Sequence, residues 1–147
     1  MQLTRAADYA VRVTIHLATL PPGTLVSRSG LAAACDVPIH FLSKVLQALV
    51  RARLIVAHRG PSGGFALAVP ADRVSVLRVV EAVEGPITLN ACVINGSGCN
   101  RQGWCPAHNV WLEAQAALAD VLSNASIGML ASAAPPPRQD NVVYPWN

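Results

Sequence analysis

The spacing of apolar positions along the chain predicts a mostly helical protein. Over much of the sequence, apolar residues recur every three or four positions, which is the period of a helix with one buried face. The run Pro21-Pro22-Gly23 interrupts this pattern early in the chain, and Gly85-Pro86 interrupts it again in the middle, because prolines cannot donate to a continuing helix. Helices are expected at residues 4–20, 27–34, 38–52, 72–84, 106–123 and 127–131.

The middle of the chain has a different pattern, typical of a β-hairpin. Two short apolar runs, 54–57 and 65–69, flank the turn-forming sequence Arg59-Gly60-Pro61-Ser62-Gly63-Gly64, and this layout favours two antiparallel strands. Leu25-Val26 is a candidate for one further short strand. The hairpin follows a short helix, a tight turn ending at Pro38 and a second helix, which is the order of a winged helix-turn-helix. We place Pro38 at the first position of that second helix, where its missing N–H costs nothing.

The second helix of this unit carries a polar stripe that indicates contact with DNA. Its inward-facing residues are expected to be Leu42, Val45, Leu46 and Leu49. In helix-turn-helix proteins the second helix enters the major groove, and polar or basic residues around it contact phosphates. The candidates for groove contacts are His40, Ser43, Lys44 and Gln47. The candidates for phosphate contacts are Arg28, Arg51, Arg59 and Ser62. The alternative interpretation is a stripe that is merely solvated.

The helix expected at residues 106–123 has an apolar stripe that a small winged module cannot bury. Packing against the same helix of a second copy solves this problem and gives a two-fold homodimer. We therefore expect a mainly α fold with a small β-hairpin wing and a long C-terminal dimerisation helix. The stripe comprises Val110, Trp111, Ala114, Leu118, Val121 and Leu122.

Charge divides the chain into two unlike halves. The net charge of +3 over 147 residues combines seven basic and two acidic side chains in residues 1–70 with four basic and six acidic ones in residues 71–147. A basic N-terminal half is typical of a nucleic-acid-binding unit, here double-stranded DNA. Chance scatter of charge over a solvated surface is the alternative.

Composition also bears on the class of protein. The mean hydropathy of +0.39 is high, but no apolar stretch approaches the ~18 residues that a membrane-spanning helix needs. The N-terminus lacks the layout of a signal peptide, so we expect a soluble, cytoplasmic protein without membrane contact. No nucleophile–base pair, paired carboxylates or phosphate-binding loop is recognisable, so an enzyme is not expected.

Three of the four cysteines lie close together and indicate a metal centre. Cys92, Cys99, Cys105 and His108 follow the spacing C-x6-C-x5-C-x2-H, and thiolates with an imidazole suit soft metals or an iron–sulfur cluster. Structural zinc is the competing interpretation, although zinc sites usually have closer cysteine pairs. Cys35 stands apart in an alanine-rich stretch and is expected to be a small buried hydrophobe.

Together these motifs resemble a known family. The chain is similar to the Rrf2 regulators, the IscR, NsrR and RirA group of bacterial repressors, over roughly residues 1–132. The wing sequence followed by the three-cysteine segment, in this order, is the most specific part of the resemblance. The motifs that carry it are Met1-Gln2-Leu3-Thr4, Asp8-Tyr9-Ala10-Val11-Arg12, Arg59-Gly60-Pro61-Ser62-Gly63-Gly64-Phe65, Val79-Val80-Glu81-Ala82-Val83-Glu84-Gly85, the three-cysteine segment and Ala125-Ser126-Ile127-Gly128-Met129-Leu130.

The resemblance implies a homodimeric DNA-binding repressor with an iron–sulfur cluster on Cys92, Cys99 and Cys105. In nitric-oxide-sensing members an aspartate from the other chain supplies the fourth ligand, and Asp8 of the partner subunit stands at the matching place. In members that control cluster biogenesis a histidine does so, and His108 stands there. The aspartate would favour [4Fe-4S], our first expectation, and the histidine would favour [2Fe-2S]. The x6 gap departs from the x5 gap common in both subgroups, so spacing does not assign the subgroup.

The resemblance also suggests a division of the chain and a hypothesis for its control. We expect a winged-helix DNA-binding domain at 1–84, a cluster-binding loop at 85–105, a dimerisation helix with a terminal turn at 106–132, and a disordered tail at 133–147. Nitric oxide, oxygen (a change of redox state) or iron shortage would each destroy the cluster, and its loss would reorient the two recognition helices. The alternative function is a zinc-stabilised DNA-binding regulator without cluster sensing.

Overall fold

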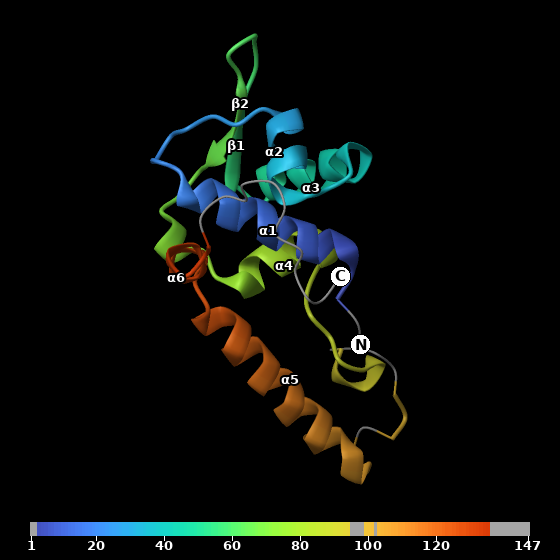
Figure 1. The fold of residues 1–147 in the computed structure, drawn as a ribbon. Helices are drawn as coiled ribbons and strands as arrows, with labels where there is room; N and C mark the ends of the chain where they lie inside the picture. Colours follow the sequence, from blue (N-terminus) through green and yellow to red (C-terminus); the bar gives the residue numbers. More distant parts are fainter. Residues whose placement is uncertain (1–2, 95–98, 102, 136–147) are drawn as a thin grey trace.

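The chain forms six α-helices and a two-stranded hairpin in the part that the structure describes (Figure 1). The structure is a computed structural model, and it describes residues 3–94, 99–101 and 103–135. The expected fold class is confirmed, and most of the expected tail lies outside the described residues. The elements are α1 (Arg5–Thr19), α2 (Arg28–Cys35), α3 (Ile39–Arg51), β1 (Ile55–His58), β2 (Gly64–Leu67), the 3-10 turn η1 (Ala71–Arg73), α4 (Val76–Glu84), the 3-10 turn η2 (Ala91–Val93), α5 (Pro106–Asn124) and α6 (Ile127–Ser132).

Hydroxyl side chains set where several helices begin. Thr4 accepts a hydrogen bond from the N–H of Ala6 at 3.2 Å, which confirms it as the N-cap of α1. Ser27 caps α2 and Ser126 caps α6 in the same way, because a side-chain oxygen satisfies an N–H that has no partner within the helix. Pro38 is the N-cap of α3 instead of its first helical residue, a shift of one position from our expectation.

The start of α4 differs more from the sequence prediction. A helix was expected from Asp72, but the helix begins only at Val76, after the separate turn η1. Val74 between them is extended and fully buried, and its carbonyl accepts a hydrogen bond from the N–H of Ile127 at 2.7 Å. Burial of this side chain and capping by Ser75 outweigh the helical spacing.

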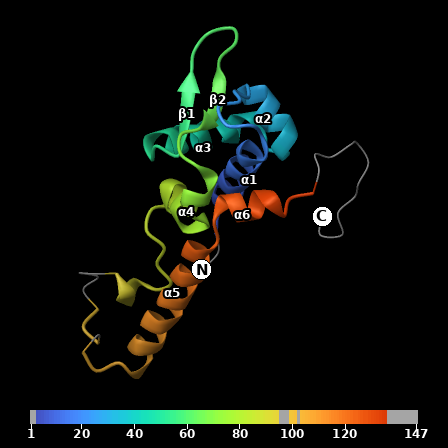
Figure 2. The same cartoon turned by 90° about the vertical axis from the view of Figure 1, so that its left-hand side faces the viewer.

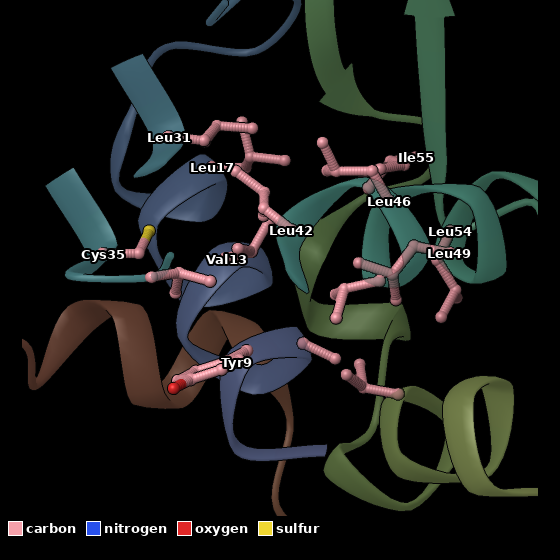
Figure 3. Packing of buried hydrophobic residues seen from close by; sticks show 14 of the residues in the cluster. Tyr9, Val13, Leu17, Leu31, Cys35, Leu42, Leu46, Leu49, Leu54 and Ile55 are labelled. Atoms are coloured by element: carbon pink, nitrogen blue, oxygen red, sulfur yellow. The ribbon is translucent and has the colours of Figure 1, made fainter. Parts of the chain in front are cut away.

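α1 lies at the centre of the fold and packs against α2, α3, α4 and α6. Figure 3 shows Val13 and Leu17 of α1 meeting Leu31 of α2 and the leucines of α3. All four residues expected on the inward face of α3 are buried, so that prediction is confirmed. Each such side chain contributes about 1.5–3 kcal/mol when it leaves water, and together they fix the orientation of α3.

The hairpin stands at one end of the molecule (Figures 1 and 2). β1 and β2 pair antiparallel, with Ile55 opposite Leu67 and His58 opposite Gly64, so the strands begin and end one or two residues from their expected limits. Val26 adds a third short segment, because it exchanges two backbone hydrogen bonds with Phe65 at 3.0 and 2.9 Å. A Cβ on Gly64 would lie 2.6 Å from the carbonyl oxygen of Val26, so this pairing requires glycine.

α5 extends away from the hairpin, toward the other end of the molecule (Figures 1 and 2). It contacts α4 and η2, and Gln115 accepts a hydrogen bond from the N–H of Leu89 at 3.1 Å. α6 then returns to the core: Ile127 is fully buried, and α6 packs against α1 and η1. α6 lies within the segment 106–132 expected to hold the dimerisation helix and a terminal turn, and its main contacts are with α1 and η1.

No single helix in the described residues is long and apolar enough to span a membrane. α2 and α3 reach the required length and hydropathy only as a pair, and they are bent by 109° at the break between them. Leu31 of α2 and Leu42 of α3 are fully buried in the core.

Candidate nucleic-acid interface and cysteine segment

The outward face of α3 carries the polar stripe that the sequence predicts. His40, Lys44, Gln47 and Arg51 are all exposed, since packing of the opposite face against α1 turns them toward solvent. The ring of His40 lies against the ring of its neighbour Phe41, with centroids 4.6 Å apart and the ring planes tilted by 44°. Whether these side chains contact DNA remains a prediction, but α3 presents them on one accessible face.

A hollow of about 490 Å³ lies between α2, α3 and the hairpin. Arg28, Ser43, Gln47 and Arg51 line it, so the structure brings four of the eight predicted DNA contacts together. Arg28 Nη1 donates to Ser43 Oγ at 3.2 Å, which links the start of α2 to α3. The remaining residues that line the hollow are apolar, and the sequence did not indicate any of them for the DNA interface: Leu46, Val50, Ala57 and Phe65.

Arg59 and Ser62 lie on the exposed turn of the hairpin, apart from this hollow. The turn is closed by a hydrogen bond from the N–H of Gly63 to the carbonyl of Gly60 at 3.0 Å. Gly60 has φ of 110°, and a Cβ on Gly63 would collide with the carbonyl of His58. This turn therefore requires glycine at both positions, and it projects a cationic side chain beyond the body of the protein.

The three clustered cysteines lie between α4 and α5. Cys92 is part of η2, Cys99 follows in the loop, and Cys105 is the N-cap of α5. All three are free and half-buried. Within residues 3–94, 99–101 and 103–135, no three His, Cys, Asp or Glu side chains are gathered closely enough to hold a metal. The three predicted cysteine ligands thus lie in one segment of the chain, but their side chains are not close enough in space to share a metal.

The two candidates for a fourth ligand differ in their surroundings. His108, in the first turn of α5, is 9% exposed, and its buried Nδ1 has no hydrogen-bond partner among the described residues. Asp8 is exposed on α1 and forms an ion pair with Arg12 at 2.7 Å. Three thiols and an imidazole with a free nitrogen are a donor set that suits iron–sulfur clusters and zinc, so by their chemistry the residues fit a metal group.

Cys35 lies outside this segment and is confirmed as a buried residue. It is 7% exposed between α1 and α2 (Figure 3). Burial raises the pKa of its thiol to about 11, against a smaller opposite effect of Arg12. A thiol with so high a pKa is a poor nucleophile and a poor metal ligand at neutral pH.

The helix-turn-helix of α2 and α3, the exposed face of α3 and the adjoining hairpin define a winged-helix DNA-binding protein. The family model of Rrf2, described as an iron-dependent transcriptional regulator, matches residues 3–133. The chain therefore belongs to the Rrf2 family of transcriptional regulators, as its sequence motifs indicated.

Relatives and solved structures agree with this assignment. An HTH-type transcriptional regulator of Mycobacterium tuberculosis is 32% identical over 136 residues, which cover 92% of this chain and 84% of the relative. One of Neisseria meningitidis is 26% identical over 127 residues, covering 86% and 85%.

Two solved structures share the fold. CymR, the global cysteine regulator of B. subtilis, gives a TM-score of 0.74 at 21% identity, over 92% of this chain and 99% of CymR. IscR of T. potens gives 0.72 at 20% identity, over 91% and 89%. At these identities the likeness shows the fold alone.

Proposed function

We propose that the chain is a homodimeric repressor whose binding to a DNA operator is controlled by an iron–sulfur cluster on Cys92, Cys99 and Cys105. The observation that carries the cluster proposal is the state of these cysteines: all three are free and half-buried in the short segment that joins α4 to α5. Free cysteines that have no chemical role are usually buried, as Cys35 is. Three thiols kept near the surface in one segment are better explained as ligands.

The surroundings of His108 support it as the fourth ligand. A buried imidazole nitrogen without a hydrogen bond costs about 1–3 kcal/mol, and coordination would remove that cost. Asp8 already has a partner in Arg12, and its carboxylate would have to leave this ion pair to ligate a cluster in the other copy. Histidine ligation favours [2Fe-2S], and ligation by Asp8 of the partner subunit favours [4Fe-4S].

The cysteine segment lies where gain or loss of the cluster would change the geometry of the DNA-binding unit. The segment begins where α4 ends in the core and ends at the N-cap of α5. Ligation of Cys92 in η2 and Cys105 at the start of α5 would fix α5 relative to α4. In a dimer built on α5, such a constraint would set the distance and angle between the two α3 helices. When bound, the cluster supplies a centre that nitric oxide, oxygen or iron shortage can remove.

Anaerobic purification with visible spectroscopy tests the cluster. We expect a brown protein that absorbs near ~400 nm, that bleaches with nitric oxide or a chelator, and whose affinity for operator DNA changes on bleaching. A colourless protein with stoichiometric zinc would show instead that the segment is a structural zinc site. Cys35→Ala is the matched control, because it removes a thiol that we place outside the cluster.

The fourth ligand is tested on the same preparation. We expect His108→Ala to change the visible spectrum and Asp8→Ala to leave it unchanged. The opposite result would assign the position to Asp8 of the partner subunit, and an unchanged spectrum in both variants would exclude both residues.

A further inference from the structure

We propose that the hollow between α2, α3 and the hairpin is an anion pocket for one phosphate group of the DNA backbone, and that Ser43 holds Arg28 in this pocket instead of contacting a base. The inference rests on the proposed DNA-binding function and deepens it. It assigns a role to the apolar lining and changes the role expected for Ser43.

The charges of the pocket favour an anion. Arg28 and Arg51 are the only charged residues that line it, and no carboxylate does. In the described part of the chain the single ion pair is that of Arg12 with Asp8, so neither pocket arginine is neutralised there. Two unneutralised guanidinium groups at one hollow attract phosphate, which they can bind with paired hydrogen bonds.

The hydroxyl of Ser43 is already used within the protein. Its oxygen accepts a hydrogen bond from Arg28 Nη1 at 3.2 Å and donates its proton to the carbonyl of Ile39 at 3.4 Å. A hydroxyl has one proton and two acceptor lone pairs, so Ser43 has no proton left for a base edge, and Arg28 already takes one of its lone pairs. Arg28 gives up one of its five N–H groups to this bond and keeps the others for a phosphate, with less side-chain entropy to lose on binding.

The apolar wall strengthens the pocket. Leu46 and Val50 of α3 face Ala57 and Phe65 of the hairpin across the hollow, and the backbone bonds between Val26 and Phe65 hold the hairpin side in place. Apolar side chains next to a charge reduce screening by water and so strengthen its attraction to an anion. Because Arg28, Gln47 and Arg51 are exposed, the hollow is open on the solvent side, as a passing DNA strand requires.

The test measures DNA binding by fluorescence anisotropy over a series of salt concentrations. The full chain binds a duplex selected from a random library and a scrambled duplex of equal length. Arg28→Ala should reduce the slope of log affinity against log salt by about 0.9 per pocket, or about 1.8 for a dimer. Arg78→Ala, which removes an exposed arginine of α4 outside the pocket, is the control and should leave the slope unchanged.

Ser43 is tested by a double-mutant cycle. Ser43→Ala should weaken binding to both duplexes by the same factor, and Ser43→Thr, which keeps the hydroxyl, should bind like the wild type. Arg28→Ala with Ser43→Ala should bind no more weakly than Arg28→Ala alone, because Ser43 acts through Arg28. A loss of preference for the selected duplex in Ser43→Ala, or additive losses, would overturn the proposal.

Two further outcomes distinguish a phosphate pocket for DNA from a pocket for a free anion, and from a failure of the proposed DNA-binding function. If inorganic phosphate raises the melting temperature of the wild type but not of Arg28→Ala, while the salt slope stays unchanged, the pocket takes a free anion and not the DNA backbone. If the wild type binds no duplex, the proposed DNA-binding function itself fails. Circular dichroism of each variant checks that the fold is intact.

Discussion

From the sequence, Asp8 of the partner subunit is the first expectation for the fourth ligand and His108 the alternative, but the fold gives the two residues different surroundings. Asp8 is exposed and paired with Arg12, whereas His108 is buried and its Nδ1 has no hydrogen-bond partner in the part of the chain that the structure describes. Sequence spacing cannot show this difference, because the burial of His108 depends on how α5 lies against its neighbours. The same holds for Ser43: the packing of α2 against α3 brings Arg28 within hydrogen-bond distance of its hydroxyl, whose proton goes to the carbonyl of Ile39 one turn earlier in α3.

Cys35 allows a test at the level of one residue. At pH 8 we expect a thiol reagent to label three cysteines of the metal-free chain quickly and Cys35 only after unfolding, because its thiol is buried and its pKa is raised to about 11. Mass spectrometry counts the labels, and Cys35→Ala should take up three labels at the wild-type rate. Fast labelling of all four would contradict the burial of Cys35.

The raised pKa of Cys35 also predicts the direction of a pH effect on stability. The folded chain favours the neutral thiol, so this contribution is complete below the ordinary pKa of 9.0 and declines as the pH rises toward about 11. The free energy of unfolding should therefore fall more between pH 9 and 11 in the wild type than in Cys35→Ala. Urea denaturation at each pH measures it.

At the level of elements, the limits of α4 show which local signals matter. The apolar spacing of residues 72–84 is helical throughout, yet the helix starts only after Ser75. An extended Val74 places its side chain in the core and its carbonyl within reach of α6, and both need residues distant in sequence. The cap at Ser75 is a local signal, and it marks the observed start correctly.

A substitution of Ser75 tests this account of α4. Ser75 Oγ accepts a hydrogen bond from the N–H of Arg78 at 3.2 Å, so Ser75→Ala should lower the free energy of unfolding by about 1 kcal/mol. Ser75→Asp keeps an acceptor and should restore most of the loss. Urea denaturation measures both, and equal stability of the alanine and aspartate variants would count against capping at this position.

At the scale of the whole molecule, α5 is the helix whose apolar side chains are least covered by the other described residues of the chain. Only His108 of this helix is buried, while Val110 and Val121 are 60% and 68% exposed. Buried residues of the other α-helices and of the hairpin form one core around α1. The exposed apolar side of α5 supports the proposed dimer, in which a second copy covers it.

Introducing a negative charge on the exposed side of α5 tests the proposed dimer. Val121→Asp should raise the dissociation constant of the dimer by at least about tenfold, or about 1.4 kcal/mol, because an unpaired charge is costly in an apolar interface. Since Val121 is exposed in a single chain, the helical circular dichroism should not change. Sedimentation measures the mass, and Leu25→Asp, at an exposed apolar residue outside α5, should remain dimeric. A dimeric Val121→Asp would place the interface elsewhere.

The sequence by itself determined the features that depend on local order along the chain. Helical spacing, caps such as Thr4 and the glycine-rich turn of the hairpin fix elements through contacts within a few residues, and the motifs in their order indicated the family. Element limits were less exact, as Pro38 and Val74 show, because an end is decided by what it packs against.

Only the tertiary structure decided which side chains meet across the fold. The joining of Arg28, Ser43 and Arg51 with Phe65 in one hollow, the return of α6 to α1 and the burial of His108 all bring together residues far apart in the chain. Their positions depend on how whole helices pack, and no pattern within a single segment records that packing.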